Sequence, residues 1–380
     1  MFKTLSISLS PNTEKEDIKL ALKLIFSPKK WKRGKGAFEL EQKISQYLGR
    51  KHAVSFNSGR SSLLAVLQSL GLKEGEEVLI QVPTCNAAVN PILWANLKPV
   101  FVDSREDTFN IDPEDIEKKI TAKSRVLMVQ HTFGLPADME KIQEIARKNN
   151  LILIEDCAHS LGARYKGQKV GTFGKAAFFS FSRDKVISSV YGGMAVTDDD
   201  GLARSIRSFQ KESGDPSSCW IMQQLMHPVL FNYFILPTYG FLSIGKAFLL
   251  LFQWLRILSK AVHWKEKRGR RPGYFPKKMP NALALLVLKQ FEKLEKFNNH
   301  RKKIAGLYYE MLKNSSLDLP VVFKDRDHVF LRFTVKSFRA HEIIKKAWIH
   351  NILIGDWYTS PIAPDDTKLE KMGYTKGECP

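Results

Sequence analysis

A lysine lies just after an apolar run near the middle of the chain. Lys185 follows the strand-like segment FFSFS (178–182) and precedes a pair of glycines at 192–193. At the edge of a sheet a lysine is shielded from water, and desolvation favours the neutral amine that forms a Schiff base with an aldehyde. Most lysines are solvated surface groups, so Lys185 indicates chemistry only in combination with other residues.

An acidic pair ends a second apolar run. The segment LILIED (151–156) finishes with Glu155 and Asp156, and His159 follows three residues later. Ligands bind at the carboxyl ends of the strands of parallel sheets, so an acid there can meet a ligand cation. The same acid can instead cap the next helix, and a lone histidine is often structural.

An anion-binding turn is indicated by the segment FNSGRSSLLAVL (56–67). Its glycine turn opens a helix, and the first backbone N–H groups of a helix are free to bind an anion beside serine hydroxyls. A serine-capped helix without a ligand also explains this segment on its own. Taken in order, however, the turn, the strand-end acid and Lys185 supply what pyridoxal phosphate requires, namely a phosphate cradle, a partner for the pyridinium nitrogen and an amine.

The elements that must position these residues follow a regular rhythm. Five short apolar runs alternate with helical patterns, at 53–57, 77–81, 99–103, 124–131 and 151–156. Runs of this kind, joined to amphipathic helices by short polar loops, predict βα units in a mostly parallel sheet. We expect an α/β large domain over residues 1–212.

A different composition begins after this domain. Thirty consecutive residues, 216–245, carry no formal charge, and eight basic residues accompany the single Glu266 between residues 260 and 278. An apolar hairpin beside a basic cluster is typical of a monotopic membrane anchor, and the run is also long enough to span a bilayer, although prolines and glycines interrupt it. The alternative is a hydrophobic helical insertion, 213–278, that packs on the protein or across a dimer interface.

A smaller α+β domain is expected over residues 279–380. Its elements are predicted as two strands and the helix between them, at 328–335, 352–355 and 341–350. Trp357 and Tyr358, in the motif GDWYTSP, either face a substrate or have a core or hinge role.

The composition limits the classes of function. The 380 residues include 59 Lys and Arg against 39 Asp and Glu, and the net charge of +20 attracts nucleic acid, anionic lipid or phosphorylated metabolites. No nucleic-acid-binding module is recognisable, so nucleic acid is not an expected partner. The four cysteines lie far apart and the N-terminus lacks an export signal, so we expect a cytoplasmic protein without disulfides or a metal site.

The motifs together resemble one enzyme family. The stretch from Gly34 through FNSGRSSL, PVFVD, FGLPADM, IEDCAHSLGARYKGQKVGTFG, SFSRDK and GGMAVTDD is similar to the DegT/DnrJ/StrS family of sugar aminotransferases. This family is a branch of the fold type I pyridoxal-phosphate enzymes. The resemblance resumes at MPNALALLVLKQFEKLEKFNNHR and covers most of the chain outside about 213–278. It implies the fold type I architecture and pyridoxal 5′-phosphate as the cofactor.

The resemblance also implies a role for each motif residue. Lys185 would form the internal aldimine and shuttle the proton of the 1,3-transfer, Asp156 would keep the ring nitrogen protonated, and His159 would lie near the phenolic oxygen. The residues implied on the phosphate side are Gly59, Arg60, Ser61 and Ser180. Because the dehydratases of the family carry histidine at the lysine position, Lys185 favours transamination.

Several positions depart from the family pattern. Arg60 stands where threonine is usual, and Cys85, in PTCNAAVN, occupies the position where many members place an aromatic side chain over the cofactor ring. The segment 275–278 replaces a region that commonly supplies an asparagine to the neighbouring subunit's phosphate. The chain stops at GYTKGECP, where members usually continue, so a truncated small domain is expected.

The expected function is transfer of an amino group, with glutamate as the donor, to a nucleotide-linked keto-sugar in the biosynthesis of cell-surface polysaccharide or glycan. The resemblance implies a homodimer, and peripheral membrane contact through residues 216–260 would place the enzyme at the inner face of the membrane. The alternative is a non-catalytic relative with a binding or regulatory role, which the departures at Arg60 and Cys85 motivate. Lys185 and Asp156 argue against it, since a scaffold needs neither.

Overall fold

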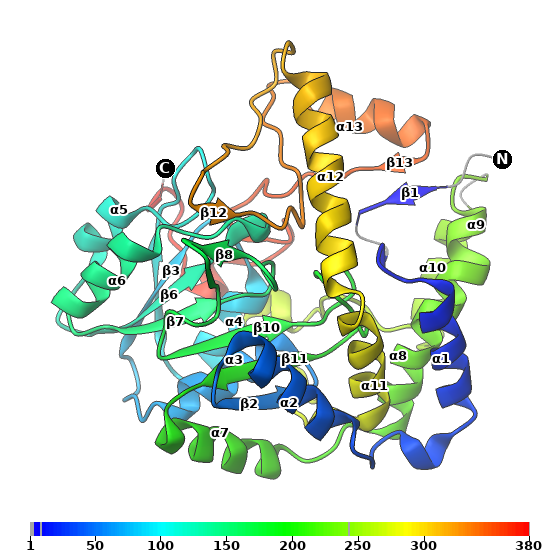
Figure 1. Ribbon diagram of the computed structural model, residues 1–380, viewed down its shortest axis with the longest axis horizontal. Helices are drawn as coiled ribbons and strands as arrows, with labels where there is room; N and C mark the ends of the chain where they lie inside the picture. Colours follow the sequence, from blue (N-terminus) through cyan, green and yellow to red (C-terminus); the bar gives the residue numbers. More distant parts are fainter. Residues whose placement is uncertain (1–3, 8–9, 242–243, 380) are drawn as a thin grey trace.

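The computed structural model describes residues 4–7, 10–241 and 244–379. Its centre is a seven-stranded sheet with the order β2-β11-β10-β7-β6-β3-β5 (Figure 1). The strands are β2 (His52–Phe56), β3 (Glu77–Gln81), β5 (Lys98–Val102), β6 (Ser124–Gln130), β7 (Ile152–Asp156), β10 (Ala176–Ser180) and β11 (Gly193–Thr197). Neighbouring strands run parallel except for β11, which is antiparallel to both β10 and β2. The mostly parallel sheet expected from the sequence is confirmed.

Helices cover both faces of this sheet. They are α2 (Gly36–Leu48), α3 (Gly59–Ser69), α4 (Asn86–Trp94), α5 (Pro113–Lys119), α6 (Met139–Lys148) and α7 (Asp200–Ser213). Successive strand residues point to opposite faces, so Val78 and Ile80 join the core beneath α3, α4 and α7, whereas Leu79 packs toward α5 and α6. Burial on both faces explains why these strands are almost continuously apolar.

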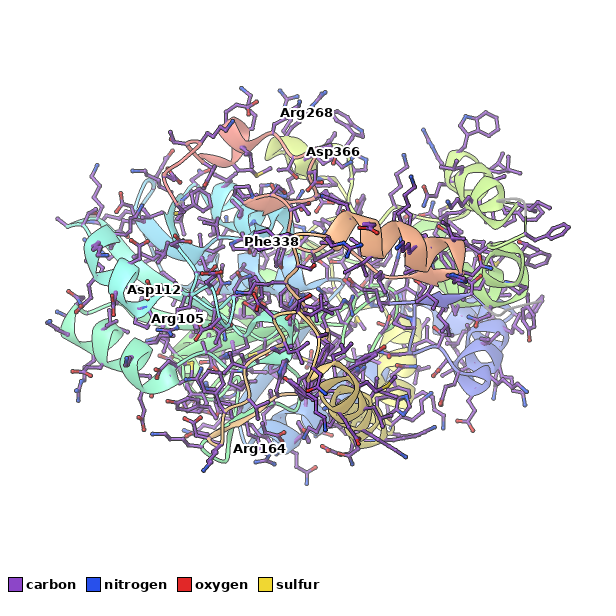
Figure 2. All side chains as sticks on the ribbon, turned by 90° about the horizontal axis from the view of Figure 1, so that it is seen from above. Arg105, Asp112, Arg164, Arg268, Phe338 and Asp366 are labelled. Atoms are coloured by element: carbon purple, nitrogen blue, oxygen red, sulfur yellow. The ribbon has the colours of Figure 1, made fainter. Side chains whose placement is uncertain are left out.

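The segment expected as an insertion forms a helical hairpin at the edge of the molecule in both views (Figures 1 and 2). Its parts are α8 (Ser218–Leu230), a π-helical turn (Phe231–Ile235), α9 (Leu236–Thr238) and α10 (Ile244–Trp254). A Cβ on Gly245 would lie 2.3 Å from the carbonyl oxygen of Ile235, so the close approach of α10 to the π-helical turn requires glycine. Within residues 4–7, 10–241 and 244–379, no helix is long and apolar enough to cross a bilayer.

Short strands join the C-terminal part to distant segments. The pairs are β1 (Leu5–Ser6) with β13 (Ile352–Leu353), β4 (Thr84–Cys85) with β14 (Ile362–Ala363), and β8 (Arg164–Tyr165) with both β9 (Gln168–Lys169) and β12 (Arg326–Asp327). Arg268 and Asp366 lie at the same edge in Figure 2, where Lys267 forms an ion pair with Asp366. The division at residues 212 and 278 stays a prediction.

The remaining helices come from the N-terminal segment and from residues 281–349. They are α1 (Lys15–Ile25), α11 (Asn281–Phe291), α12 (Leu294–Leu312) and α13 (Ala340–Ile349), with 3₁₀ turns at Pro28–Lys30, Thr132–Gly134, Glu266–Arg268 and Leu369–Met372. The helix expected at 341–350 is confirmed as α13, and the strand expected at 352–355 is present as the shorter β13.

The strand expected over 328–335 is wrong. Only Arg326–Asp327 forms a strand in this region. The backbone N–H of Val329 donates to the carbonyl of Gly134 at 3.2 Å, in the loop after β6, and not to a neighbouring strand. Val329 and Leu331 are buried, so the alternating apolar pattern reflects docking on the large sheet's loops.

Candidate active site

A cavity of about 250 Å³ lies at the carboxyl edge of the sheet, where β6, β7 and β10 end. Seven of the eight expected site residues line it, namely Gly59, Arg60, Cys85, Asp156, His159, Ser180 and Lys185. The eighth, Ser61, is not among the lining residues. The loops that follow parallel strands converge at this edge, which is why residues far apart in the sequence meet here.

Lys185 lies in the loop after β10 and contacts His159. Its Nζ is 2.9 Å from Nε2 of His159 and 4.0 Å from a carboxylate oxygen of Asp184. Burial lowers the pKa of His159 well below its usual range, and the charge of Lys185 lowers it further. The imidazole is therefore neutral, and the ring of Phe133 stacks on it with the two planes 7° apart. An amine and a neutral imidazole in contact can hold and pass a proton.

Asp156 is the last residue of β7, and its carboxylate is oriented from two sides. One oxygen accepts a hydrogen bond from Nε2 of Gln130 at 2.9 Å, and the other accepts from the backbone N–H of Ala158 at 2.9 Å. The Thr84 hydroxyl donates to Oε1 of Gln130 at 2.9 Å and fixes that amide. Burial raises the pKa of Asp156 despite these bonds. A cationic group beside it would reverse this shift, because an opposite charge favours the ionised carboxylate.

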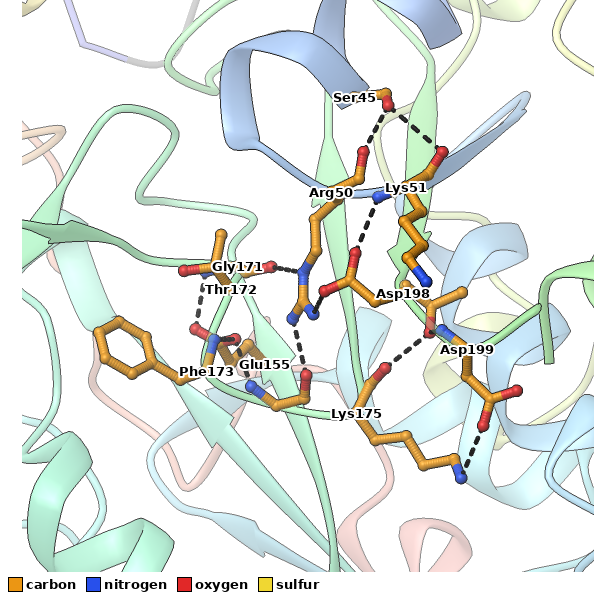
Figure 3. A network of polar contacts seen from close by, with 12 residues as sticks. Ser45, Arg50, Lys51, Glu155, Gly171, Thr172, Phe173, Lys175, Asp198 and Asp199 are labelled. Carbon is orange, nitrogen blue, oxygen red and sulfur yellow. Dashed lines mark hydrogen bonds and ion pairs between the residues drawn. The ribbon is translucent and has the colours of Figure 1, made fainter. Parts of the chain in front are cut away.

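Glu155, the neighbour of Asp156, points to the other face of the sheet because strand residues alternate. Its carboxylate accepts hydrogen bonds from three backbone N–H groups of the loop 171–174. Arg50 fixes the same loop by donating to its carbonyls, and it also forms an ion pair with Asp198 at 2.7 Å (Figure 3). Glu155 therefore stabilises the fold, and Asp156 alone of this pair lines the cavity.

The start of α3 is held by a serine cap. The Ser58 hydroxyl oxygen accepts a hydrogen bond from the backbone N–H of Ser61 at 3.1 Å. The Ser61 hydroxyl donates to Oδ1 of Asn57 at 2.7 Å, so it is used within the cap. This arrangement accounts for the position of Ser61 outside the cavity and fixes the first turn of the helix.

Two glycines allow this first turn to lie against the strand ends. A Cβ on Gly59 would lie 3.0 Å from the Cβ of Ser180 and 3.3 Å from its hydroxyl oxygen. A Cβ on Gly193 would lie 2.4 Å from the backbone nitrogen of Gly59, closer than real Cβ atoms approach. The first turn of α3 is therefore packed on the ends of β10 and β11, and the space beside Gly59 is one that a side chain would fill.

Arg60, the second residue of α3, is paired within the protein. Its Nε is 2.5 Å from Oε1 of Glu266, and both side chains are buried. Its Nη2 donates to the carbonyl of Ala261 at 3.4 Å. Burial opposes the charge of Arg60, but Glu266, with smaller contributions from Tyr191, Cys85 and Tyr274, offsets this and raises the pKa of the guanidinium. Residues 259–275, here called the insertion arm, thus neutralise the cation expected at the phosphate turn.

Cys85 and two aromatic residues of the C-terminal part complete one wall. Cys85 precedes α4, and Trp357 and Tyr358 come from the motif GDWYTSP. The ring of Tyr358 is 5.6 Å from that of Phe133. Burial raises the pKa of both the Cys85 thiol and the Tyr358 hydroxyl, so neither carries charge at neutral pH. The wall is therefore uncharged and largely aromatic.

The cavity also contains residues that the sequence analysis did not single out. Among them are Gln130, Arg183, Tyr191, Ala261 and Val262. The rule that placed Asp156 could have found Gln130, because β6 lies next to β7 and ends at the same edge. No comparable pattern could have found Ala261 and Val262 of the insertion arm, because the local sequence does not show that this segment packs against the sheet.

A sequence profile of the DegT/DnrJ/EryC1/StrS aminotransferase family matches residues 12–226 and 252–380. The chain belongs to this family. The protein is therefore an aminotransferase, and its cofactor is pyridoxal 5′-phosphate, as the resemblance of the motifs implied. The unmatched residues between these two ranges, 227–251, lie within the segment expected as an insertion.

Relatives of known name share most of the chain. The GDP-perosamine synthase of Caulobacter vibrioides is 30% identical over 306 residues, which cover 80% of this chain and 69% of the relative. The pleiotropic regulatory protein of Geobacillus stearothermophilus is 29% identical over 346 residues, which cover 90% of this chain and 79% of the relative. The putative sugar aminotransferase Spr1654 of Streptococcus pneumoniae, solved in its PMP form, superposes with a TM-score of 0.70 at 18% identity over 95% of this chain and 84% of that one. The fold type I architecture is confirmed.

The residues of the cavity fit the cofactor of the family. A pyridinium nitrogen can pair with the Asp156 carboxylate, whose pKa is raised by burial and would be lowered by such a cation. A phosphate can use the space that glycine leaves at Gly59, next to the hydroxyl of Ser180 and the start of a helix. Lys185 supplies an amine in the same cavity.

Proposed function

We propose that the protein transfers an amino group from glutamate to a keto-sugar linked to a nucleotide, in the biosynthesis of a cell-surface polysaccharide or glycan. The observation that carries this proposal is the single cavity lined by both the amine of Lys185 and the buried carboxylate of Asp156. The relative from Caulobacter vibrioides is named a GDP-perosamine synthase, which supports a nucleotide-linked sugar as the acceptor. The net charge of +20 suits a substrate that carries a diphosphate.

In this proposal Lys185 holds the cofactor and carries the proton. When bound, pyridoxal 5′-phosphate supplies an electron sink that stabilises the negative charge left on a carbon when its proton is removed. Nζ of Lys185 takes that proton and returns it at the other end of the reacting group, while His159, 2.9 Å away, directs the amine. Asp156 keeps a proton on the ring nitrogen through its negative charge, and Gln130 fixes the direction of its carboxylate.

The phosphate side is assigned to the first turn of α3. Free N–H groups at a helix start stabilise a phosphate through hydrogen bonds and the helix dipole. Gly59 leaves space for it, and Ser180 adds a hydroxyl beside that space. Arg60 contributes less than its charge suggests, because Glu266 neutralises it at 2.5 Å. Cys85 lines the same cavity and is assigned beside the ring, where it would offer no aromatic face.

The acceptor sugar is assigned to the aromatic wall. Trp357 and Tyr358 line the cavity from the C-terminal part, and sugar rings present C–H faces that pack on aromatic rings. Because these residues come from a different part of the chain than Lys185, a movement of the C-terminal part would change access to the amine.

The absorbance spectrum of the purified protein tests the proposed function. We expect a band in the near-ultraviolet to visible region that shifts on addition of glutamate and is absent in Lys185→Ala. Lys175→Ala is the matched control, because Lys175 lies at the opposite end of β10 on the surface, paired with Asp199 at 3.0 Å. Its spectrum should equal that of the unaltered protein. A protein that stays colourless after incubation with pyridoxal 5′-phosphate would overturn the proposal.

We also propose that the enzyme is a homodimer and that the hairpin contacts the inner face of the cytoplasmic membrane. The apolar patch of the hairpin consists of the exposed residues Tyr233, Phe234, Leu250, Leu251, Trp254 and Leu255. Trp254 is 78% and Leu250 67% exposed, although both are strongly apolar. The one acid among residues 260–278, Glu266, is fully buried against Arg60, so the exposed charge of this segment is entirely positive. Anionic lipid complements both features.

Sedimentation with vesicles tests the membrane contact. The protein should bind phosphatidylserine-containing vesicles and bind pure phosphatidylcholine vesicles weakly, and the Leu250→Ser/Trp254→Ser variant should lose at least about tenfold in affinity. Phe338→Ser is the control, because Phe338 is fully exposed elsewhere on the surface (Figure 2). Equal vesicle binding by the patch variant would contradict the proposal. Dissociation of a dimer by the same variant, without vesicle binding by the unaltered protein, would assign the patch to the subunit interface.

A further inference from the structure

Arg183 lines the cavity two residues before Lys185 and lacks an acidic partner. Arg60 pairs with Glu266 at 2.5 Å, and Lys185 is 4.0 Å from Asp184. In the described part of the chain, no carboxylate lies within ion-pair distance of Arg183, which is thus the unpaired cation among these three cavity-lining side chains.

The guanidinium of Arg183 is nevertheless held in place. Its Nη2 donates to the Ser259 hydroxyl at 2.6 Å, and the guanidinium carbon, Cζ, lies 5.5 Å from the ring centroid of Tyr191. The Ser259 hydroxyl donates its own proton to Oε1 of Gln224 at 2.8 Å, which leaves its lone pairs for Arg183. Gln224 is fully buried on α8, so the hairpin helix and the insertion arm together build this contact.

Nε of Arg183 is buried and has no hydrogen-bond partner among the described residues. An arginine has five N–H donors, and a buried donor without an acceptor is costly. The neighbouring acids do not compensate its charge, because Asp184 is shared between Lys185 and Arg332, the latter at 3.3 Å. Arg183 is therefore a cation of the cavity that has no ion-pair partner among the described residues and carries an orphaned donor.

We propose that Arg183 binds a phosphate group in the cavity, with Ser259 and Gln224 as its positioning residues. A planar guanidinium matches the geometry of phosphate oxygens and binds them through parallel hydrogen bonds. The proposal rests on the proposed function for the source of the phosphate, which is either the 5′-phosphate of the cofactor or the diphosphate of the sugar nucleotide. It gives the insertion arm a direct part in the site.

Inorganic phosphate tests the binding without any catalytic turnover. In phosphate-free buffer, Arg183→Met should melt at a temperature equal to or above that of the unaltered protein, because a buried unpaired charge has been removed. Added phosphate should raise the melting temperature of the unaltered protein and leave that of Arg183→Met unchanged. Arg204→Met, at an exposed position on α7, should respond to phosphate as the unaltered protein does. A lower melting temperature of Arg183→Met in phosphate-free buffer together with a normal phosphate response would overturn the proposal.

Two ligand pairs distinguish the sources of the phosphate. If Arg183 binds the cofactor, Arg183→Met should weaken binding of pyridoxal 5′-phosphate at least tenfold and leave binding of pyridoxal, which lacks the phosphate, unchanged. If it binds the substrate, the same loss should appear with GDP or UDP and be absent with guanosine or uridine. Ser259→Ala should weaken binding of the same phosphorylated ligand by a smaller factor than Arg183→Met does. Arg183→Lys should retain part of the affinity that Arg183→Met loses. A phosphate-binding role would be refuted if Arg183→Met weakened binding of phosphorylated and unphosphorylated probes equally, or if it weakened binding of neither. The melting and binding measurements need no turnover, so they still test phosphate binding by Arg183 if the spectrum of Lys185→Ala shows that the proposed transamination is wrong.

Discussion

The amine of Lys185 and the imidazole of His159 are in direct contact, with 2.9 Å between Nζ and Nε2. Burial and the lysine charge hold the pKa of His159 well below its usual range, so the ring is neutral. Its other nitrogen, Nδ1, accepts the backbone N–H of Phe133 at 3.4 Å. A neutral imidazole that accepts at Nδ1 carries its proton on Nε2, so His159 donates to Lys185 when that amine is in the neutral form needed for catalysis, and the contact then fixes the direction of the amine.

Replacement of His159 tests this contact. His159→Ala should slow the reaction with glutamate by about 10²-fold, because a proton carrier that is poorly oriented loses much of its effect. His159→Gln keeps an N–H donor and should recover most of the rate. Single-turnover decay of the Lys185-dependent absorbance band measures both variants, and the band itself should remain in each. An unchanged rate in His159→Ala would show that the contact has no part in proton movement.

Asp156→Asn should retain the cofactor and lose most of the activity. The amide cannot stabilise a protonated ring nitrogen, and removal of one such electrostatic contact costs about 10²–10³-fold in rate. Gln130→Met should lose about tenfold, since it frees the carboxylate of Asp156 without removing its charge. The band position should shift in Asp156→Asn and stay unchanged in Gln130→Met. Equal losses in the two variants would indicate that Gln130 acts on the fold.

Gly59→Ala should weaken cofactor binding at the phosphate side. The added Cβ would lie 3.0 Å from the Cβ of Ser180, in the space assigned to phosphate. We expect at least a tenfold loss in affinity for pyridoxal 5′-phosphate with a far smaller effect on pyridoxal. Gly306→Ala is the matched control, because Gly306 lies in α12 with nothing within 4 Å of an added Cβ, and alanine there should stabilise the helix by about 0.5–1 kcal/mol. Equal affinity in Gly59→Ala would remove Gly59 from the phosphate site.

The parts of the site that sequence analysis found are those fixed by local order. Asp156 and Ser180 end strands whose apolar runs are readable, Lys185 follows the second of them, and parallel strands bring such positions to one edge. The same pattern could not separate Asp156 from Glu155, because only the register of β7 decides which of the two faces the cavity.

The parts that it missed depend on contacts between distant segments. Arg60 is neutralised by Glu266, and Arg183 is held by Ser259, 76 residues away. Both partners lie in the insertion arm. The apolar and basic composition of this segment indicates what its surface is like, but it does not predict that the segment packs against the end of the sheet. The strand predicted at 328–335 failed for a related reason. Val329 and Leu331 are buried, and the backbone N–H groups of Val329 and Arg332 donate to the carbonyls of Gly134 and Phe133, in the loop after β6.

A buried histidine makes the stability of the fold dependent on pH. His328 packs on Phe330 with ring centroids 3.8 Å apart, and burial lowers its pKa to about 4. In the unfolded chain its pKa is about 6.5. Between these two values the unfolded state binds a proton that the native state does not, so the free energy of unfolding falls as the pH falls. The contribution of His328 is complete above about pH 6.5 and is lost progressively toward pH 4.

Urea unfolding at about pH 7 and pH 5 measures this effect. His328 alone should account for a loss of up to about 2 kcal/mol over that interval, at 1.36 kcal/mol for each unit below 6.5. His328→Gln should therefore show a smaller difference between the two conditions. It should not abolish the difference, because burial also lowers the pKa of His159 and His227. His300→Gln, at an exposed position on α12, is the control and should leave the difference unchanged. A pH difference in His328→Gln as large as in the unaltered protein would show that His328 is accessible to protons in the native state.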